Sequence, residues 1–245
     1  MKNLVSIILG LCCLLSVTPV TAGVIDYTLW EKVLSTHVDD QGRVNYKGLK
    51  KSPTELDQFI EILIATDINV LSPTQQKAFW INAYNALTLM VVRDNYPTKS
   101  IRKINFRLVW ELPRKVALGK YSLGKIEHKI LRPLKDPRIH FAINCASIGC
   151  PNLPNKPFYP ETLDEQLDFE TKRFINDHEK LRIDRTAKVL YHSAILKWFH
   201  KDFLVKYPHL LGYIMAYINE SDRSYLEKNE VKIEVLDYNW GINKQ

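Results

Sequence analysis

Two cysteines that lie close together are the residues of this sequence best suited to chemistry. Cys145 and Cys150 stand in HFAINCASIGCP, residues 140–151, whereas Cys12 and Cys13 lie near the start of the chain. Cys145 can act as a nucleophile, as one half of a disulfide with Cys150, or as a small buried residue. No histidine stands at ligand spacing from the two thiols, so the sequence predicts no metal site.

An acid and a base that are adjacent in the sequence could serve such a thiol. The segment LGKIEHKILRPL, residues 123–134, is predicted to form a short helix with Glu127 in the middle of its apolar face. A carboxylate in that place is either paired or has a raised pKa. His128 lies about 100° further round the helix, and it is our first choice of base for Cys145.

The residues before Cys145 predict a strand. RIHFAIN, residues 138–144, alternates so that His140 and Cys145 face opposite sides and lie roughly 16 Å apart along the strand. His140 is therefore not expected to be the base that activates Cys145. We assign it a substrate-binding or orienting role instead.

A long apolar stretch, LSPTQQKAFWINAYNALTLMVVRDNYP at residues 71–97, predicts a buried central helix. Ser72 and Gln75 form a capping-box pattern at its start. Asn82 and Asn85 lie three residues apart and so share a face. Both should be hydrogen-bonded, because a buried amide without partners costs roughly 1–3 kcal/mol. Either they tie the helix to a neighbouring segment, or one of them positions a substrate or an oxyanion.

Helices and short strands follow one another along the chain without a strict βαβ order. Further helices are expected within residues 26–38, 44–67, 162–176 (after a capping box of Thr162 and Glu165), 194–207 and 208–218. Strands are expected at residues 116–123 (a pair around a turn at Gly119 and Lys120), 181–184, 188–191 and 231–240. The predicted fold class is α+β, a central buried helix with a small, mostly antiparallel sheet and several surrounding helices. No repeat or linker divides residues 23–245, which we interpret as a single globular domain.

Residues 1–22 have the features of a cleaved secretory signal peptide. Lys2 gives a positive start, residues 4–17 form an apolar core shorter than a membrane span, and Val20-Thr21-Ala22 fits a cleavage site. The mature protein is expected to begin at Gly23 and to be periplasmic or secreted. An uncleaved membrane anchor is the alternative, and no later run predicts a transmembrane segment.

The charge of the chain is modestly basic and scattered. Lysine and arginine number 34 against 27 aspartates and glutamates, for a net charge of +7. Proteins that bind nucleic acid concentrate their positive charge and use recognisable modules, so no nucleic-acid partner is expected. The expected partner is a small-molecule, peptide or envelope substrate. The sequence predicts no cofactor and leaves the oligomeric state open.

Four blocks occur in order over about residues 30–243: FWINAYNALTL, YSLGKIEHKIL, DPRIHFAINCASIGCP and DYNWGIN. Together they resemble a family known as domain of unknown function 547. The resemblance places the family motifs on Asn82, Asn85, Glu127, His128, His140 and Cys145. It implies a fold neighbourhood and candidate site residues without a reaction. A central helix on a small sheet, with a cysteine, a histidine and amides, also resembles papain-like and transglutaminase-like thiol enzymes.

Three hypotheses follow from these residues. In the first, an exported thiol enzyme performs acyl transfer or amide or ester hydrolysis on a peptide or envelope polymer, with Cys145 as nucleophile, His128 as base and Glu127 orienting the base. In the second, Cys145 and Cys150 cycle between dithiol and disulfide, although their spacing is longer than the C-x-x-C of thioredoxin-like proteins. In the third, the chain is a non-enzymatic envelope-binding or structural module.

Overall fold

The computed structural model describes residues 23–245, and the predicted signal peptide, residues 1–22, lies outside them. The fold is mixed α+β, as predicted. Its helical segments are α1 (Thr28–His37), α2 (Tyr46–Lys51), α3 (Thr54–Ala65), η1 (Ile68–Val70), α4 (Pro73–Asp94), η2 (Ile101–Trp110), α5 (Leu123–Lys125), η3 (Ile126–Leu131), η4 (Arg132–Leu134), α6 (Ile139–Ala142), η5 (Pro160–Thr162), α7 (Leu163–Ile175), α8 (Ala194–Trp198), α9 (His200–Phe203), α10 (Leu210–Tyr217) and α11 (Glu220–Lys228). Its strands are β1 (Arg114–Val116), β2 (Gly119–Tyr121), β3 (Leu181–Asp184), β4 (Val189–His192) and β5 (Lys232–Val235). No helix within this part of the chain has the length and apolar character needed to cross a membrane.

The strands form two small, separate sheets. β1 and β2 make an antiparallel hairpin, and in the second sheet β4 pairs antiparallel with β3 and parallel with β5. The hairpin turns at Ala117 and Leu118, both with positive φ, so the predicted turn at Gly119 and Lys120 is wrong. The parallel pair needs a long crossover, and helices α8 to α11 supply it between β4 and β5.

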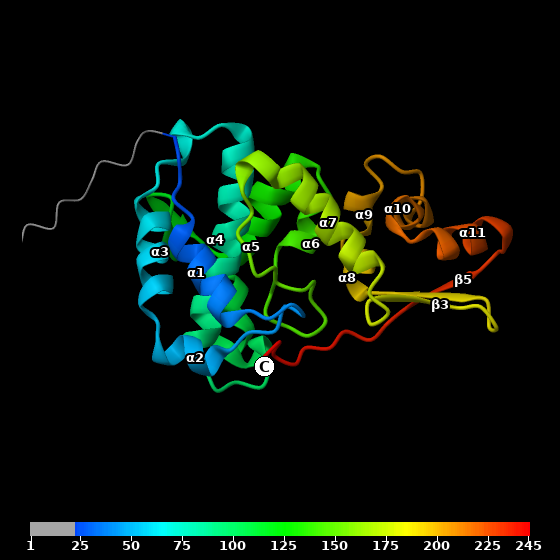
Figure 1. Ribbon diagram of the computed structural model, residues 1–245, viewed down its shortest axis with the longest axis horizontal. Helices are drawn as coiled ribbons and strands as arrows, with labels where there is room; N and C mark the ends of the chain where they lie inside the picture. Colours follow the sequence, from blue (N-terminus) through cyan, green and yellow to red (C-terminus); the bar gives the residue numbers. More distant parts are fainter. Residues whose placement is uncertain (1–22) are drawn as a thin grey trace, which may run out of the picture.

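Helix α4 lies between α3 and the α5–α6 region (Figure 1). It begins at the predicted capping box, in which the Ser72 side chain accepts from the N–H of Gln75 and the Gln75 side chain accepts from the N–H of Ser72. Residues 78–89 are all buried. Helices α2 and α3 and the segment η3 all contact α4, and a helix enclosed by neighbours is expected to be apolar all round.

Buried apolar side chains form two clusters. The larger cluster surrounds α4 and includes residues of α1, α2 and α3. The smaller one centres on Phe141, Phe203 and Tyr213. Helices α6 and α7 contribute to both clusters, so they connect the α1–α5 half of the molecule to the end that carries α10, α11 and β5 (Figure 1).

Residues 139–142 form the short helix α6, so the strand predicted there is wrong. All four α6 residues are buried, and a segment that is buried on every side shows no reliable period in its sequence. The chain becomes extended only at Ile143. The predicted separation of His140 and Cys145 on opposite faces of a strand is therefore wrong as well.

Two predicted helices are each divided in two. Residues 44–67 contain α2 and α3, which separate at Ser52 and Pro53 because a residue before proline disfavours helical geometry. Residues 194–207 contain α8 and α9. Helix α7 begins without the predicted capping box, since Thr162 makes no side-chain cap hydrogen bond.

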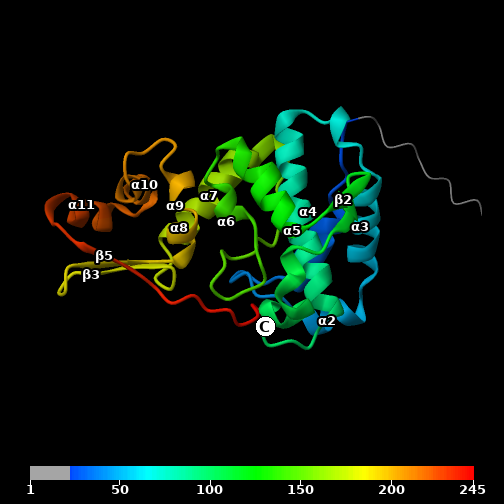
Figure 2. The same ribbon diagram turned by 180° about the vertical axis from the view of Figure 1, so that it is seen from behind.

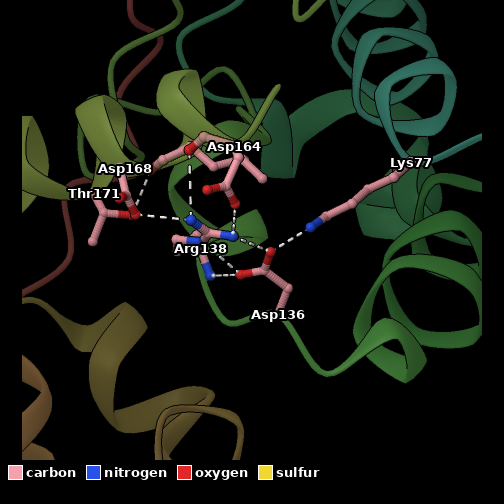
Figure 3. A network of polar contacts seen from close by, with 7 residues as sticks. Lys77, Asp136, Arg138, Asp164, Asp168 and Thr171 are labelled. Carbon is pink, nitrogen blue, oxygen red and sulfur yellow. Dashed lines mark hydrogen bonds and ion pairs between the residues drawn. The ribbon is translucent and has the colours of Figure 1, made fainter. Parts of the chain in front are cut away.

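An ion network holds the segment that leads into α6 (Figure 3). Arg138 donates to the carboxylates of Asp136, Asp164 and Asp168, and Lys77 pairs with Asp136. Burial alone would raise the pKa of Asp136, but the hydrogen bonds and charges of Arg138 and Lys77 hold it well below its usual range. The network thereby ties α4 and α7 to the start of α6.

The C-terminal segment returns from β5 to the region beside α2 (Figures 1 and 2). On the way it pairs with the loop that carries the two cysteines. The N–H of Ile148 donates to the carbonyl of Gly241 at 2.8 Å, and the N–H of Gly149 donates to the carbonyl of Asn239 at 2.9 Å. The blocks CASIGC and DYNWGIN, almost a hundred residues apart in the chain, are therefore neighbours in space.

Candidate active site

A cavity of about 290 Å³ lies where the cysteine loop, η3, α6, α8 and the C-terminal segment meet. Its polar and reactive lining residues are Tyr84, Glu111, Glu127, His128, His140, Cys145, Cys150 and Tyr238. Its other lining residues are Trp110, Ile143, Pro151, Ile195, Trp198, Phe199 and Trp240. The structure thus brings most of the predicted site residues together. Within residues 23–245, no group of three or more histidine, cysteine or acidic residues is arranged to hold a metal ion.

Cys145 and Cys150 form a disulfide, which is one of the states expected from the sequence. Cys145 is half-buried and Cys150 is buried. The hydroxyl of Tyr238 lies 3.2 Å from each sulfur, and the N–H of Cys145 donates to the Sγ of Cys150 at 3.0 Å. Cys145 is therefore the more exposed of the two residues, whereas the sulfur of Cys150 accepts from both the N–H of Cys145 and the hydroxyl of Tyr238.

His140 is buried and fixed in one orientation. Its Nε2 lies 2.8 Å from Oδ2 of Asp202 in α9, and its ring stacks on Phe199 with the centroids 4.0 Å apart. A carboxylate only accepts hydrogen bonds, so Nε2 carries the proton and Nδ1 keeps a lone pair. Burial lowers the pKa of His140, and the hydrogen bond to Asp202 opposes that effect. The ring is thus a neutral base whose position is set by Asp202.

Asp202 is held in turn by Arg132. The guanidinium donates to both carboxylate oxygens, with Nε at 2.6 Å and Nη2 at 3.0 Å. Burial would raise the pKa of Asp202, but the hydrogen bonds from His140 and Arg132 hold it well below its usual range. A two-pronged contact of this kind fixes both the position and the charge of a carboxylate. The imidazole of His140 consequently faces a permanent negative charge.

Glu127 is 9% exposed and lines the cavity. Its carboxylate makes no hydrogen bond or ion pair with any residue that the structure describes. Burial raises the pKa of Glu127 to about 7; the charge of Arg132 opposes the increase and that of Asp202 adds to it. The position of Glu127 on an apolar helix face predicts a carboxylate that is either paired or has a raised pKa, and the structure shows the second of these. A carboxyl group with such a pKa can take up or release a proton near neutral pH.

His128 lines the same cavity but contacts Arg132, with Nδ1 3.4 Å from Nη1. Burial lowers the pKa of His128, and the charge of Arg132 lowers it further. Among the described residues no hydrogen bond joins His128 to Glu127 or to Cys145. The expected orientation of His128 by Glu127 is therefore not formed, because neighbouring residues of a helix point in different directions.

Asn82 is buried and hydrogen-bonded, as predicted, but it does not line the cavity. Its Oδ1 accepts from the indole N–H of Trp30 and from the N–H of Phe158, both at 3.0 Å. Its Nδ2 donates to the carbonyl of Phe158 at 2.7 Å. Asn82 therefore connects α4 to α1 and to the loop before α7, which is the structural one of its two predicted roles.

Asn85 is also buried and forms two hydrogen bonds with the backbone between α6 and the cysteine loop. Its Nδ2 donates to the carbonyl of Ala142 at 2.9 Å, and its Oδ1 accepts from the N–H of Asn144 at 2.8 Å. Asn85 does not line the cavity either. It acts on the site through the backbone that precedes Cys145.

Several residues of the site were missed by sequence reasoning. Asp202 lies in KWFHKDF, where an acid in an amphipathic helix is typical of a solvated face. Trp110 and Trp198 likewise gave no signal. Tyr238 and Trp240 belong to the DYNWGIN block, so the family resemblance pointed to them, although no local pattern assigned them a role.

Residues 68–175 match the model of a family described as "Protein of unknown function, DUF547". The match confirms the predicted family resemblance over that range, which contains Asn82, Asn85, Glu127, His128, His140 and Cys145. The DYNWGIN block lies outside the matched range. A search of curated proteins and a search of solved structures each found no match.

Proposed function

We propose that this protein is an exported thiol enzyme that performs acyl transfer, or amide or ester hydrolysis, on a peptide or envelope polymer. Cys145 is the nucleophile, and His140, oriented by Asp202, is the base. The observation that carries the proposal is that Cys145 and His140 line one cavity, while Asp202 holds Nε2 of His140 at 2.8 Å. This pairing replaces the base, His128, that the sequence alone favours.

The proposed reaction begins with reduction of the disulfide by an external dithiol, which leaves thiols on Cys145 and Cys150. Nδ1 of His140 then takes the proton of the Cys145 thiol, and the thiolate attacks the substrate carbonyl carbon. Collapse of the tetrahedral adduct forms a thioester and expels an amine or alcohol, which receives the proton from His140. Water or a second amine releases the acyl group and regenerates the thiol.

Glu127 has a supporting role in this proposal. Its carboxyl group faces the cavity with a pKa of about 7 and no partner among the described residues. In its protonated form it can donate a hydrogen bond to the oxygen of the bound substrate. Positioning of the substrate thus falls to Glu127, whereas activation of the thiol and protonation of the leaving group fall to His140.

Alkylation kinetics of the reduced protein test the base. The rate of iodoacetamide labelling at Cys145, followed by mass spectrometry, should show an apparent pKa below the roughly 8.5 of an ordinary thiol. His140→Gln and Asp202→Asn should each slow labelling at neutral pH about tenfold or more. His128→Gln, a matched change in the same cavity, should leave the rate within about twofold. If His128→Gln slowed labelling more than His140→Gln, His128 would be the base, as the sequence favours. If the folded protein were not labelled at all, the result would support a non-enzymatic module.

A second candidate function, thiol–disulfide exchange, is favoured by the observed Cys145–Cys150 disulfide and by the Tyr238 hydroxyl within 3.2 Å of both sulfurs. In this reaction an external thiolate attacks Sγ of Cys145, and Cys150 leaves as the thiolate. Cys150→Ser separates the two functions. It should abolish catalysis of dithiol oxidation but leave the alkylation rate of Cys145 and any ester hydrolysis intact.

Export is part of the proposal and is tested separately. Its support is the charge, apolar core and small-residue pattern of residues 1–22, together with a disulfide, which persists mainly in oxidising compartments. Intact mass of the protein from an envelope fraction should show a chain that begins at Gly23 or within a residue or two of it. A cytoplasmic species that retains Met1 would contradict export.

A further inference from the structure

We propose that a second cavity, lined by Arg43, Lys180 and Lys244, binds a small oxyanion, either a carboxylate or a phosphate. This cavity has a volume of about 420 Å³. It adjoins the candidate active site through the cysteine loop, because Cys150 and Pro151 line both cavities. The proposal does not depend on the reaction assigned to the active site.

Lys180 is the main reason for proposing a ligand here. Its residue is 6% exposed, and its ammonium donates to the carbonyl of Ile148 in the cysteine loop. An ammonium has three donors, and the described residues provide neither a second acceptor nor a carboxylate at ion-pair distance. A buried charge without a counter-ion is unfavourable, because the lost hydration is not replaced by another interaction. A neutral hydrogen-bond donor would bind the Ile148 carbonyl equally well. This contact therefore does not account for a positive charge at the position, whereas a bound anion would.

The charges around the cavity favour an anion. Arg43 and Lys244 add two exposed cationic side chains to Lys180, and neither makes an ion pair within the described part of the chain. The acids that line the cavity are Asp177 and Glu179. Three cationic groups therefore face two acidic ones. Burial lowers the pKa of Lys180 and the two acids raise it, and a bound anion would add to the effect of the acids.

The wall of this cavity is built by a close approach of backbone segments. Gly42 has a positive φ of 70°, and a Cβ there would stand 2.5 Å from the backbone nitrogen of Leu153. The carbonyl of Gly42 also accepts from Nδ2 of Asn243 at 3.2 Å. A side chain at position 42 would push these segments apart, so this wall of the cavity depends on the glycine.

An oxyanion fits these groups better than a neutral or cationic ligand. Its oxygens can accept from the ammonium of Lys180 and from the planar guanidinium of Arg43, which line the same cavity. A cation would be repelled by the excess positive charge. A carboxylate and a phosphate share this chemistry, so the experiment includes both.

Calorimetric titration of the whole mature protein with sodium phosphate, and separately with sodium acetate, tests the proposal, with sodium chloride at the same ionic strength as the reference. We expect saturable binding of at least one of the two anions. Lys180→Met should weaken that binding about tenfold or more, because it removes the only buried charge of the site. Lys180→Arg should retain most of it.

Arg43→Met provides a second test that does not threaten the core, because Arg43 is exposed. Arg43→Met should weaken anion binding severalfold. The control is Lys172→Met, at an exposed lysine of α7 outside the cavity, and it should leave anion binding unchanged. Preference for phosphate or acetate in the wild type identifies the ligand class. Absence of saturable binding of both anions, or equal binding by the wild type and Arg43→Met, would overturn the proposal.

Discussion

The carboxylate of Asp202 lies 2.8 Å from Nε2 of His140, although the two residues are 62 positions apart in the chain. The contact joins α9 to α6. Arg132 donates to both oxygens of the same carboxylate, including the Oδ2 that contacts His140. The two interactions give the buried imidazole a fixed tautomer and a fixed direction, which are the properties required of a base.

Asp202→Asn should lower the pKa of His140 below its already lowered value. Burial depresses the pKa of this histidine, and the carboxylate is what opposes the depression. A pH titration of the His140 Cε1–H resonance by NMR measures the change. Glu227→Gln, at an exposed acid of α11, is the control and should leave the resonance unaffected. An unchanged or raised pKa in Asp202→Asn would show that the contact does not act on the ring.

Glu127→Gln should remove a pH-dependent part of the stability. The folded-state pKa of Glu127 is raised from 4.5 to about 7, so between these values the folded protein keeps a proton that the unfolded chain has lost. Stability therefore falls as pH rises through this window, by roughly 3 kcal/mol from this one group.

Urea unfolding of the wild type and Glu127→Gln at about pH 5 and about pH 8 tests this value. The variant should gain stability relative to the wild type at the higher pH and show little difference at the lower one. Glu170, whose pKa burial also raises to about 7, is present in both proteins and cancels in the comparison. Parallel pH profiles for the two proteins would mean that Glu127 is not protonated at neutral pH.

Asn82→Leu should destabilise the protein by roughly 1–3 kcal/mol. The change leaves the indole N–H of Trp30 and the N–H of Phe158 buried without an acceptor. The free energy of unfolding in urea measures the loss. Gln58→Leu on the exposed surface of α3 removes an amide of similar size and should have little effect. Equal stability of the wild type and Asn82→Leu would contradict the tie between α4 and α1.

Arg138→Met should destabilise the protein by on the order of 3 kcal/mol, because it leaves the largely buried carboxylate of Asp136 without its main partner. Lys32→Met, which breaks the exposed pair with Glu55, should cost less than about 1 kcal/mol. The two free energies of unfolding are measured side by side. Similar losses would mean that the network in Figure 3 contributes no more than a surface pair.

The same network sets a direction for acid denaturation. The pKa of Asp136 is lower in the folded protein than in the unfolded chain. The contribution of Asp136 to the free energy of unfolding is therefore complete above its pKa in the unfolded chain, and it is lost as pH falls toward its pKa in the folded protein. Arg138→Met should therefore show a shallower loss of stability on acidification than the wild type. A steeper loss of stability in Arg138→Met than in the wild type would contradict the role of Arg138 in lowering the pKa of Asp136.

Local patterns in the sequence were enough to identify the central helix and its two amides. The capping box at Ser72 and Gln75 and the apolar residues on all sides of α4 depend on neighbours within a few positions, so they can be read without a structure. The raised pKa of Glu127 belongs to the same class, because helix periodicity alone placed its carboxylate among apolar side chains.

Only the tertiary structure decided which groups meet at the site. Residues 139–142 are enclosed on every side, so their sequence carries no signal that distinguishes the helix α6 from a strand. Asp202 reaches His140, and Tyr238 reaches both cysteine sulfurs, through packing between segments that are distant in the chain. Contacts of this kind depend on how whole elements are oriented, and residue type and spacing within one segment do not encode that orientation. The sequence therefore determined the candidate nucleophile, whereas the fold determined its base and its surroundings.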